Sequence, residues 1–422
     1  MSQKIIEIMA PAGSFESLQA ALFAGANSVY FGIEQLNMRA HAANNFQISD
    51  LPEIVRLCEE KNCKTYLTLN TILYNHDIVL MKKIIDEVKK VGVTAIIASD
   101  IAAISYANEV GVEVHISTQA NVSNIEAVKF FAKFADVIVL ARELPLTHIK
   151  SICETIEKEH ICGPKGNLVE IEIFAHGALC VAISGKCYMS LATQNSSANR
   201  GACLQNCRRS YRVIDEETGE ELVLDNKYVM SPKDLCTIGF IDKILDAGVT
   251  VLKLEGRGRP ADYVHTVTKT YRDAANAYLE GTYTPEKIES WTHDLETVFN
   301  RGFWHGGYYM GKQLGEWSGL YGSKASEEKI YLGKGLHYYE KPQIGEFTLE
   351  SGELSLEDEV YIIGPTTGVL RQKVTALRVD EGDVTVAKKG QIFTMPVEKK
   401  VRSSDKLFVI KKRNTEYAKG NA

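Results

Sequence analysis

Residues 5–32, IIEIMAPAGSFESLQAALFAGANSVYFG, contain the unit from which most of this chain is built. A short apolar strand pattern (5–9) leads through a turn into a segment (14–26) whose apolar residues recur every three or four positions, as on one face of a helix. A second strand pattern (28–32) follows a glycine-containing turn. The stretch therefore predicts a strand, a helix and a second strand parallel to the first.

The same unit recurs up to about residue 260. The eight strand patterns are IIEIM (5–9), SVYFG (28–32), KTYLTLN (64–70), TAIIAS (94–99), EVHIST (113–118), VIVLA (137–141), VEIEIF (169–174) and TVLKLEG (250–256). Because each strand pattern is followed by helical spacing, we predict a (β/α)8, TIM-like barrel rather than an open doubly wound sheet. Residues 261–281 are expected to form its eighth helix.

In such a barrel, chemistry takes place at the carboxyl-terminal ends of the strands. The polar residues that follow the predicted strands are Asn70, Asp100, Gln119, Arg142, Glu143, His176, Glu255 and Arg257. Asp100 and Gln119 could equally cap the next helix. The predicted catalytic residues are Arg39, His176, Glu255 and Arg257, and Arg142 is predicted to bind substrate.

Arg39 lies in FGIEQLNMRAHAANNF, a long loop after the second strand, and loops of this length in a compact barrel are usually functional. A guanidinium at this position or at Arg257 could hold a carboxylate or phosphate through two hydrogen bonds. The structural alternative for Arg39 is an ion pair with Glu34 or Glu7.

Residues 174–212, FAHGALCVAISGKCYMSLATQNSSANRGACLQNCRRSYR, begin at the end of the seventh strand and hold four of the nine cysteines. These are Cys180, Cys187, Cys203 and Cys207. Thiolates at short spacing bind zinc, copper(I) or iron–sulfur clusters. Zinc prefers tighter spacings than C-x6-C and C-x3-C, so we favour a [4Fe-4S] cluster. The alternative is four unrelated thiols, since free cysteine often serves as a small buried apolar residue.

The composition, with 422 residues, 45% hydrophobic and 24% charged, is that of a globular protein with a large core. The N-terminal sequence lacks the pattern of a signal peptide, and no run of eighteen apolar residues predicts a membrane span. We therefore expect a cytoplasmic protein with reduced thiols. A homo-oligomer is compatible with the sequence.

With a net charge of −6, any nucleic-acid surface must be a local patch. One basic patch surrounds the cysteines, and within it we predict that Arg200, Arg208 and Arg209 bind substrate. A second runs from Lys399 to Arg413. The alternative for the second patch is a solvated charged face.

Three parts of the chain are expected. Residues 1–282 form the barrel, with a cysteine-rich insertion at 177–249 that acts as a lid. Residues 283–333 form a helical and aromatic arm. Alternating strand patterns with glycine turns predict a small β-barrel over 334–415, whose basic closing segment favours RNA as a partner.

Several motifs resemble those of the collagenase-like peptidase U32 family, namely APAGSFESLQAALFAGANSVYFG, NMRAHAANNF, FAHGALCVAISGKCYMS, NRGACLQNC, SPKDLC and LKLEGRGRPADYV. Length and the appended β domain look most like a bacterial subgroup that makes 5-hydroxyuridine at the tRNA wobble position. The resemblance implies a [4Fe-4S] cluster and prephenate, a small dicarboxylate, as a metabolic partner. It carries the ligand role to the four cysteines above, with Cys236 of SPKDLC as a rival for the fourth position.

We therefore expect an iron–sulfur-dependent tRNA hydroxylase. The alternatives are a collagenase-like peptidase and an enzyme that hydroxylates a cytidine of 23S rRNA. The sequence contains neither G-x-S-x-G nor H-E-x-x-H, so a peptidase would have to combine His176 with one of the clustered thiols.

Overall fold

The computed structural model describes residues 6–40, 45–183, 186–212, 214–219, 230–306, 322–380 and 382–413. Eight parallel strands form a closed barrel: β1 (Glu7–Pro11), β2 (Ser28–Phe31), β3 (Lys64–Leu69), β4 (Ala95–Ala98), β5 (Glu113–Ile116), β6 (Val137–Val139), β7 (Glu170–Gly177) and β9 (Val251–Leu254). β9 pairs in parallel with both β7 and β1, which closes the ring. The predicted TIM-like barrel is thus confirmed.

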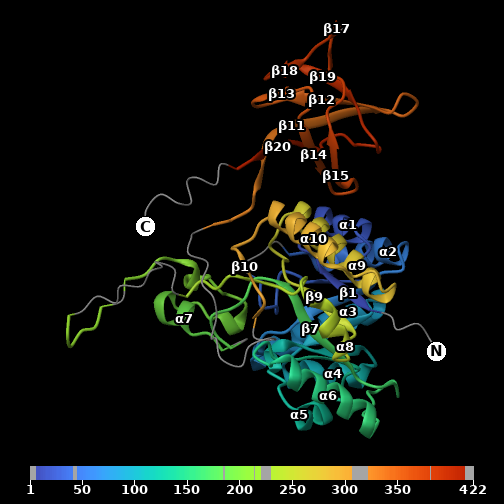
Figure 1. Ribbon diagram of the computed structural model, residues 1–422. Helices are drawn as coiled ribbons and strands as arrows, with labels where there is room; N and C mark the ends of the chain where they lie inside the picture. The colour runs from blue at the N-terminus through green and yellow to red at the C-terminus, as the bar shows by residue number, and fades with distance from the viewer. Residues whose placement is uncertain are drawn as a thin grey trace.

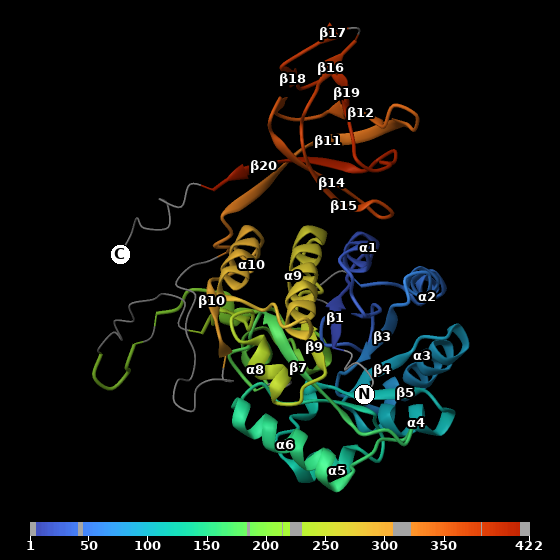
Figure 2. The ribbon, with the colours of Figure 1, turned by 45° about the vertical axis from the view of Figure 1, so that its right-hand side comes forward.

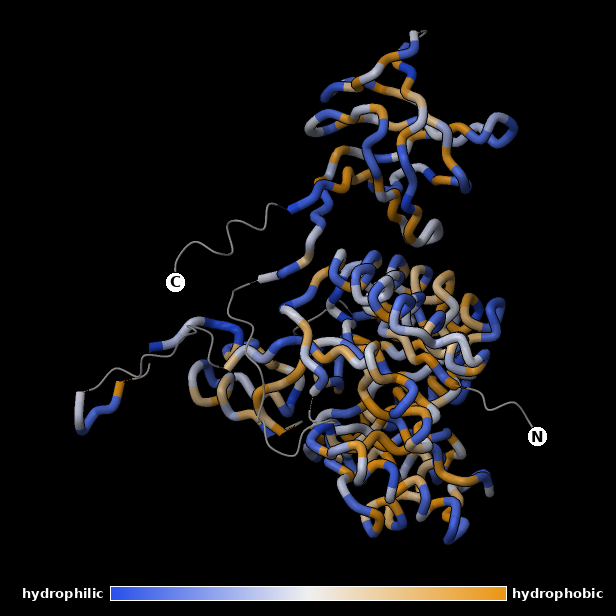
Figure 3. The backbone as a smooth tube through the Cα atoms, in the orientation of Figure 1, coloured by the Kyte–Doolittle hydropathy of each residue, from blue (hydrophilic) through white to orange (hydrophobic). Residues whose placement is uncertain are grey.

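Helices alternate with these strands and surround them (Figures 1 and 2). They are α1 (Phe15–Phe23), α2 (Leu51–Glu59), α3 (Ile78–Val91), α4 (Ile101–Val110), α5 (Ile125–Phe131), α6 (Leu146–Glu159), α8 (Ile241–Asp246) and α9 (Ala261–Leu279). Their boundaries follow local signals. Ser14 caps α1 by accepting from the Ser17 amide, whereas Gly92 ends α3 in the left-handed conformation that suits glycine. Hydrophobic segments recur along the barrel portion of the chain (Figure 3).

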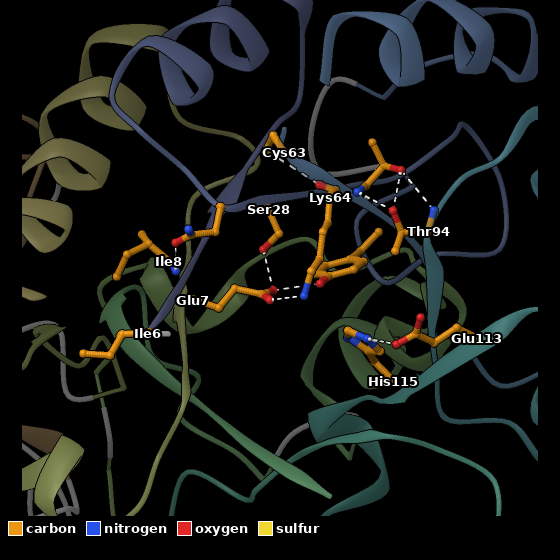
Figure 4. Close-up of polar contacts among 12 residues, drawn as sticks. Ile6, Glu7, Ile8, Ser28, Cys63, Lys64, Thr94, Glu113 and His115 are labelled. Atoms are coloured by element: carbon orange, nitrogen blue, oxygen red, sulfur yellow. Dashed lines mark hydrogen bonds and ion pairs between the residues drawn. The ribbon is translucent and has the colours of Figure 1, made fainter. Parts of the chain in front are cut away.

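The interior of the barrel combines apolar and aromatic side chains with buried charged groups, and one charged cluster lies at its amino-terminal end. Met9, Tyr30 and Tyr66 lie in a buried interior cluster. Below them, Glu7 Oε1 accepts hydrogen bonds of 2.8 Å from the hydroxyls of Ser28 and Tyr66, and Glu7 Oε2 accepts one of 2.8 Å from Lys64 (Figure 4). Because side chains at this end of a TIM-like barrel usually serve stability, we assign this cluster a structural role.

The segment between β7 and β9 contains the cysteine-rich stretch. It holds α7 (Met189–Gln194), which lies to one side of the barrel in Figure 1, and β8 (Asp234–Cys236). β8 pairs antiparallel with the end of β7. The same segment ends in α8, whose buried Ile241 and Ile244 pack into the barrel core, so the last part of the predicted insertion belongs to the barrel itself.

After α9, the chain continues through α10 (Pro285–Thr297) and β10 (Phe303–Trp304), which pairs with β8. Residues 307–321, which include most of the glycine-rich aromatic run of the predicted arm, lie outside the described residues.

The C-terminal part is an antiparallel β structure. Its strands are β11 (Glu327–Tyr339), β12 (Ile344–Leu349), β13 (Glu353–Ser355), β14 (Glu359–Gly364), β15 (Gly368–Lys373), β16 (Arg378–Val379), β17 (Gly382–Asp383), β18 (Val386–Lys388), β19 (Ile392–Pro396) and β20 (Lys406–Lys412). Eight of them form one sheet in the order β15-β14-β20-β11-β12-β19-β16-β17, and β13 pairs with β18. The predicted C-terminal β domain is confirmed, although β11 starts before the predicted boundary at residue 334.

This sheet curls around its own core and contacts the barrel. Gln372 on β15 donates to the Pro396 carbonyl at 2.8 Å and accepts from the Glu398 amide at 3.1 Å, which ties together strands far apart in the pairing order. Gly368 at the start of β15 lies against Phe23 of α1, and Lys329 of β11 pairs with Asp262 of α9. The sheet therefore docks on the α1 and α9 side of the barrel (Figure 2).

None of the helices in the described part of the chain is both long enough and apolar enough to cross a lipid bilayer.

Candidate functional site

A cavity of about 240 Å³ opens at the carboxyl-terminal ends of the barrel strands. Side chains from the barrel strands, from the loops that follow them and from the cysteine-rich segment form its walls. Its charged lining residues are Arg39, Arg142, Arg208, Lys253, Glu255, Arg257, Arg259 and Arg301. Seven of these eight carry positive charge and one carries negative charge, so the cavity attracts anions.

Four thiols line this cavity: Cys180, Cys187, Cys203 and Cys207. All nine cysteines of the chain are free thiols. The pKa of Cys207 is raised, mainly by burial, and neighbouring Cys180, Cys203 and Cys187 contribute to the increase. The four sulfurs are thus close enough to influence one another electrostatically.

The polypeptide that carries these thiols is held in place by polar contacts with α7. Ser190 Oγ accepts a hydrogen bond of 3.0 Å from the Leu204 amide, and Asn206 donates to the Thr193 hydroxyl. Gly201, at φ +83°, passes so close to the Asn37 carbonyl that a side chain would collide with it. These contacts fix the turn between the two cysteine pairs against the loop after β2.

Arg39 and Glu255 form an ion pair across the cavity wall. Arg39 Nη2 lies 3.0 Å from Glu255 Oε1, and the Ala178 amide donates to Glu255 Oε2 at 3.3 Å. Burial raises the pKa of Glu255, but Arg39 and Arg259 outweigh it and hold this pKa below its usual value. Arg39 therefore pairs with a residue of the site itself, and not with Glu34 or Glu7.

Arg257 lies deep in the same wall. It is 7% exposed and donates to the Thr68 hydroxyl at 2.9 Å. Burial lowers its pKa to about 10. Gly32 lies directly beside it, and a Cβ at Gly32 would overlap Arg257 Nη1. The absence of a side chain at Gly32 thus makes room for the guanidinium.

Two further guanidinium groups approach the thiols. Arg142 lies near Cys180 and lowers the pKa of its thiol. Arg208 donates to the Leu179 carbonyl at 2.5 Å and to the Pro232 carbonyl at 3.0 Å. Burial raises the pKa of Cys180, but Arg142, Arg39 and Arg208 together lower it below the ordinary value for a thiol. Cys180 is thereby biased toward the thiolate that a metal requires.

Three charged residues of the cavity lining were not singled out from the sequence. Lys253 lies on β9, two positions before Glu255, and alternation along a strand places both on the same face. Arg259 and Arg301 stack on the ring of Phe299, at 3.6 and 5.2 Å from its centroid. Alternation could have revealed Lys253, but no local signal connects Arg301 to the barrel mouth.

His176 and Cys236 are not among the described residues that line the cavity. Each belongs to one of two antiparallel neighbours, His176 on β7 and Cys236 on β8, and both contact Tyr271. Burial lowers the pKa of His176 to about 3 and raises that of Cys236 to about 11. Near neutral pH the imidazole and the thiol are therefore both uncharged.

Arg200 and Arg209 also lie outside the described lining. Arg200 pairs with Asp77 at 2.5 Å, donates to the Ile72 carbonyl at 2.6 Å and stacks over the Tyr74 ring. Arg209 is exposed at the surface. Of the three arginines predicted to bind substrate near the cysteines, only Arg208 faces the cavity.

The basic C-terminal segment pairs with acidic side chains of its own domain. Lys400 pairs with Glu340, Lys411 lies 2.6 Å from Asp358, and Arg413 lies 3.7 Å from Glu328. These contacts agree with the alternative of a solvated charged face.

The remaining strand-end residues divide between the two predicted roles. Asp100 caps α4 by accepting from the Ala102 amide at 2.9 Å. Asn70 and Gln119 line the cavity. Asn70 accepts from the Met38 amide at 3.2 Å and donates to Ser117 Oγ at 3.3 Å, so it links the loops after β2 and β5.

Among the described residues, no three histidine, cysteine, aspartate or glutamate side chains converge closely enough to hold a single metal ion. The four thiols face one cavity without meeting at a point. Their chemistry, soft sulfur donors beside guanidinium groups, suits an anionic, thiolate-bound group larger than one ion.

A family model matches this chain, and three of the relatives that are similar to it are described below. A model described as peptidase family U32 matches residues 13–319. A Porphyromonas gingivalis protein named collagenase is 57% identical over 413 residues, which cover 98% of this chain and 100% of the relative. A tRNA hydroxylation protein of Bacillus subtilis is 30% identical over 413 residues, covering 94% of this chain and 93% of the relative. A 23S rRNA 5-hydroxycytidine synthase of Escherichia coli is 34% identical over 281 residues, covering 66% of this chain and 41% of the relative.

The relative that is 57% identical is named collagenase, whereas the tRNA hydroxylation protein is only 30% identical. Sequence identity therefore supports the predicted alternative, a collagenase-like peptidase, better than it supports tRNA hydroxylation.

Proposed function

Because the chain belongs to peptidase family U32, whose members carry the names of both peptidases and RNA hydroxylation proteins, we propose from its cavity that it is an iron–sulfur enzyme that hydroxylates a pyrimidine base of RNA. The observation that carries this proposal is the set of four thiols that face one cavity beside guanidinium groups. We take the wobble uridine of tRNA as the substrate base and the cytoplasm as the compartment.

The thiols of Cys180, Cys187, Cys203 and Cys207 would hold a [4Fe-4S] cluster. A bound cluster supplies one-electron chemistry, or an iron site at which an oxygen donor binds. Two observations support this fit. The lowered pKa of Cys180 favours the thiolate form, and the surrounding arginines would neutralise the negative charge of a thiolate-bound cluster.

Cationic groups of the cavity lining would hold the substrates. Arg257 and Arg142 are suited to bind the carboxylates of a small dicarboxylate such as prephenate, because a guanidinium matches a carboxylate through two parallel hydrogen bonds. The Arg39–Glu255 ion pair would hold the cavity wall in place. A base must leave its stack to enter the cavity, as in other enzymes that modify a base.

A second candidate function, peptide hydrolysis, is favoured by the 57% identical relative named collagenase. A thiol peptidase needs a base within hydrogen-bonding reach of its nucleophile. His176, the base predicted for this role, is buried and is not among the described residues that line the cavity. The described lining therefore lacks the histidine–cysteine pair that such a peptidase would use, which supports the redox reaction.

The test compares two thiol variants. Cys203→Ala removes a cavity thiol, whereas Cys236→Ala removes a buried thiol outside the cavity and serves as the matched control. Each protein is purified without oxygen for iron and sulfide analysis, and each gene is returned to a deletion strain for mass spectrometry of tRNA nucleosides.

We expect wild type and Cys236→Ala to contain iron and sulfide and to restore 5-hydroxyuridine derivatives, and Cys203→Ala to do neither. Gelatin cleavage by wild type and by Cys203→Ala alike, with an unchanged nucleoside profile in the deletion strain, would favour the peptidase instead.

A further inference from the structure

A buried ion pair forms part of the cavity floor. Lys253 of β9 is 5% exposed and lines the cavity, and its Nζ lies 2.7 Å from Glu172 Oε1 on the neighbouring strand β7. The ammonium lies over the rings of Tyr30 and Phe174, at 4.7 and 5.6 Å from their centroids. Glu172 is fully buried, and its second oxygen, Oε2, has no hydrogen-bond partner among the described residues. Moving these two charges from water into the protein interior costs free energy of desolvation, which their mutual attraction offsets only in part.

The other charged groups around Lys253 are poorly suited to exchange a proton. The six guanidiniums of the described lining remain protonated at physiological pH. Glu255 is held as a carboxylate by Arg39 and by the Ala178 amide. Tyr30 donates its hydroxyl hydrogen to the Leu254 carbonyl at 2.9 Å, and burial raises its pKa.

The thiols are already assigned to the cluster under the proposed function. Of the described cavity-lining side chains, Lys253 therefore remains as an ionisable group free for acid–base chemistry, because an ammonium can release a proton and take it back.

We infer that Lys253 is the residue that exchanges a proton with the bound base, and that Glu172 is its positioning residue. This inference rests on the proposed function. In this exchange the Lys253 Nζ–H bond breaks, its electron pair stays on nitrogen, and a lone pair on a carbonyl oxygen of the base forms the new O–H bond. The reverse transfer returns the proton to the amine, so the exchange changes no oxidation state and consumes no net proton. The two-electron oxidation that hydroxylation requires would come from the cofactor and the oxygen donor of the proposed function, and Lys253 takes no part in it.

Glu172 has two effects on this exchange. Its Oε1 accepts a hydrogen bond of 2.7 Å from Nζ and holds the ammonium at the cavity floor, and its negative charge balances the charge of that ammonium in the protein interior. The aromatic rings on either side restrict the ammonium to one position and exclude water from it.

The inference is tested by substitutions that separate charge from proton transfer. Lys253→Arg keeps a positive charge that cannot be released, so we expect KM to stay within about threefold while kcat falls about 10²- to 10⁴-fold. Lys253→Ala leaves space for a small amine. Methylamine should restore kcat in this variant as its concentration rises, whereas guanidine, which brings charge but stays protonated near neutral pH, should not.

Lys253→Ala leaves Glu172 as an unpaired buried charge and is expected to reduce stability. The double variant Lys253→Met with Glu172→Gln, neutral and similar in shape, provides a second test in a folded protein. It should bind iron and tRNA as wild type does, with a kcat as low as that of Lys253→Arg. Lys64→Met, at the opposite end of the barrel, is the matched control and should retain wild-type kcat.

The outcomes separate the two proposals. If wild type forms no hydroxylated nucleoside, the proposed function and this inference both fail. If wild type is active and Lys253→Arg keeps its kcat, or folded Lys253→Ala is not rescued by methylamine, the inference about Lys253 alone is overturned.

Discussion

The close approach of Gly32 to Arg257 gives a quantitative prediction for Gly32→Ala. A Cβ at Gly32 would overlap Arg257 Nη1 and lie 2.9 Å from both Asn37 Cγ and Asn45 Oδ1. Non-bonded heavy atoms prefer about 3.5–4.0 Å, so the guanidinium would have to retreat by about 1 Å or more. That movement breaks the 2.9 Å hydrogen bond from Arg257 to Thr68.

The magnitude follows from two overlapping costs. Overpacking a dense interior costs about 1–3 kcal/mol, and loss of a hydrogen bond from a charged group costs about 1.5–3 kcal/mol. We expect the free energy of unfolding to fall by about 2–4 kcal/mol. Because misplacing a substrate-binding group by 1 Å can cost about 10²-fold in rate, hydroxylation should decrease by roughly that factor.

Gly239→Ala is the matched control, since Gly239 is exposed and nothing lies within 4 Å of the position of its Cβ. Urea unfolding monitored by circular dichroism gives the two free energies, and tRNA nucleoside analysis gives the activities. If Gly32→Ala unfolds within about 0.5 kcal/mol of Gly239→Ala and keeps full activity, the steric argument for Arg257 is wrong.

Three further predictions concern residues away from the cavity. Burial raises the pKa of Glu113, but His115 and Lys165 outweigh it and lower this pKa to about 2. Since the folded value lies below the usual 4.5, the carboxylate stabilises the fold above about pH 4.5, and that contribution is lost as the pH falls toward 2. In Glu113→Gln the free energy of unfolding should therefore depend less on pH between 4.5 and 2. An unchanged pH dependence would refute the stabilising role of Glu113. Arg200→Met should destabilise the protein by about 1–3 kcal/mol, because it loses the contact with Asp77, while KM for tRNA stays the same. A raised KM in steady-state kinetics would show instead that Arg200 binds substrate. Lys329→Met removes a contact between β11 and α9, so limited proteolysis should cut between the barrel and the C-terminal sheet faster than in wild type, whereas equal rates would mean that apolar packing alone holds the domains together.

The barrel was predictable because its strands are short, regularly spaced apolar runs separated by helical segments. β8 was not predicted, since a strand of three residues has no measurable period and depends on pairing with β7, far away in the sequence. β10, with two residues, is a similar case.

The strand-end rule brought Arg142, Glu255 and Arg257 together correctly, because parallel strands deliver their following residues to one end of a barrel, and the unusual length of the loop after the second strand pointed to Arg39. It could not tell which way a side chain turns, and His176 and Arg200 lie beside the cavity without facing it. Proximity to the cysteines in sequence was therefore a weaker guide than position on a strand.

The ion pair between Arg39 and Glu255 joins residues 216 positions apart. One partner follows the second strand to be synthesised and the other follows the strand that closes the ring, so neither half of the chain can make this contact alone. A fragment that ended before β9 would have the thiols but only part of the wall opposite them. Assembly of a working site is thus coupled to completion of the whole barrel, and a truncated product would be inert rather than partly active.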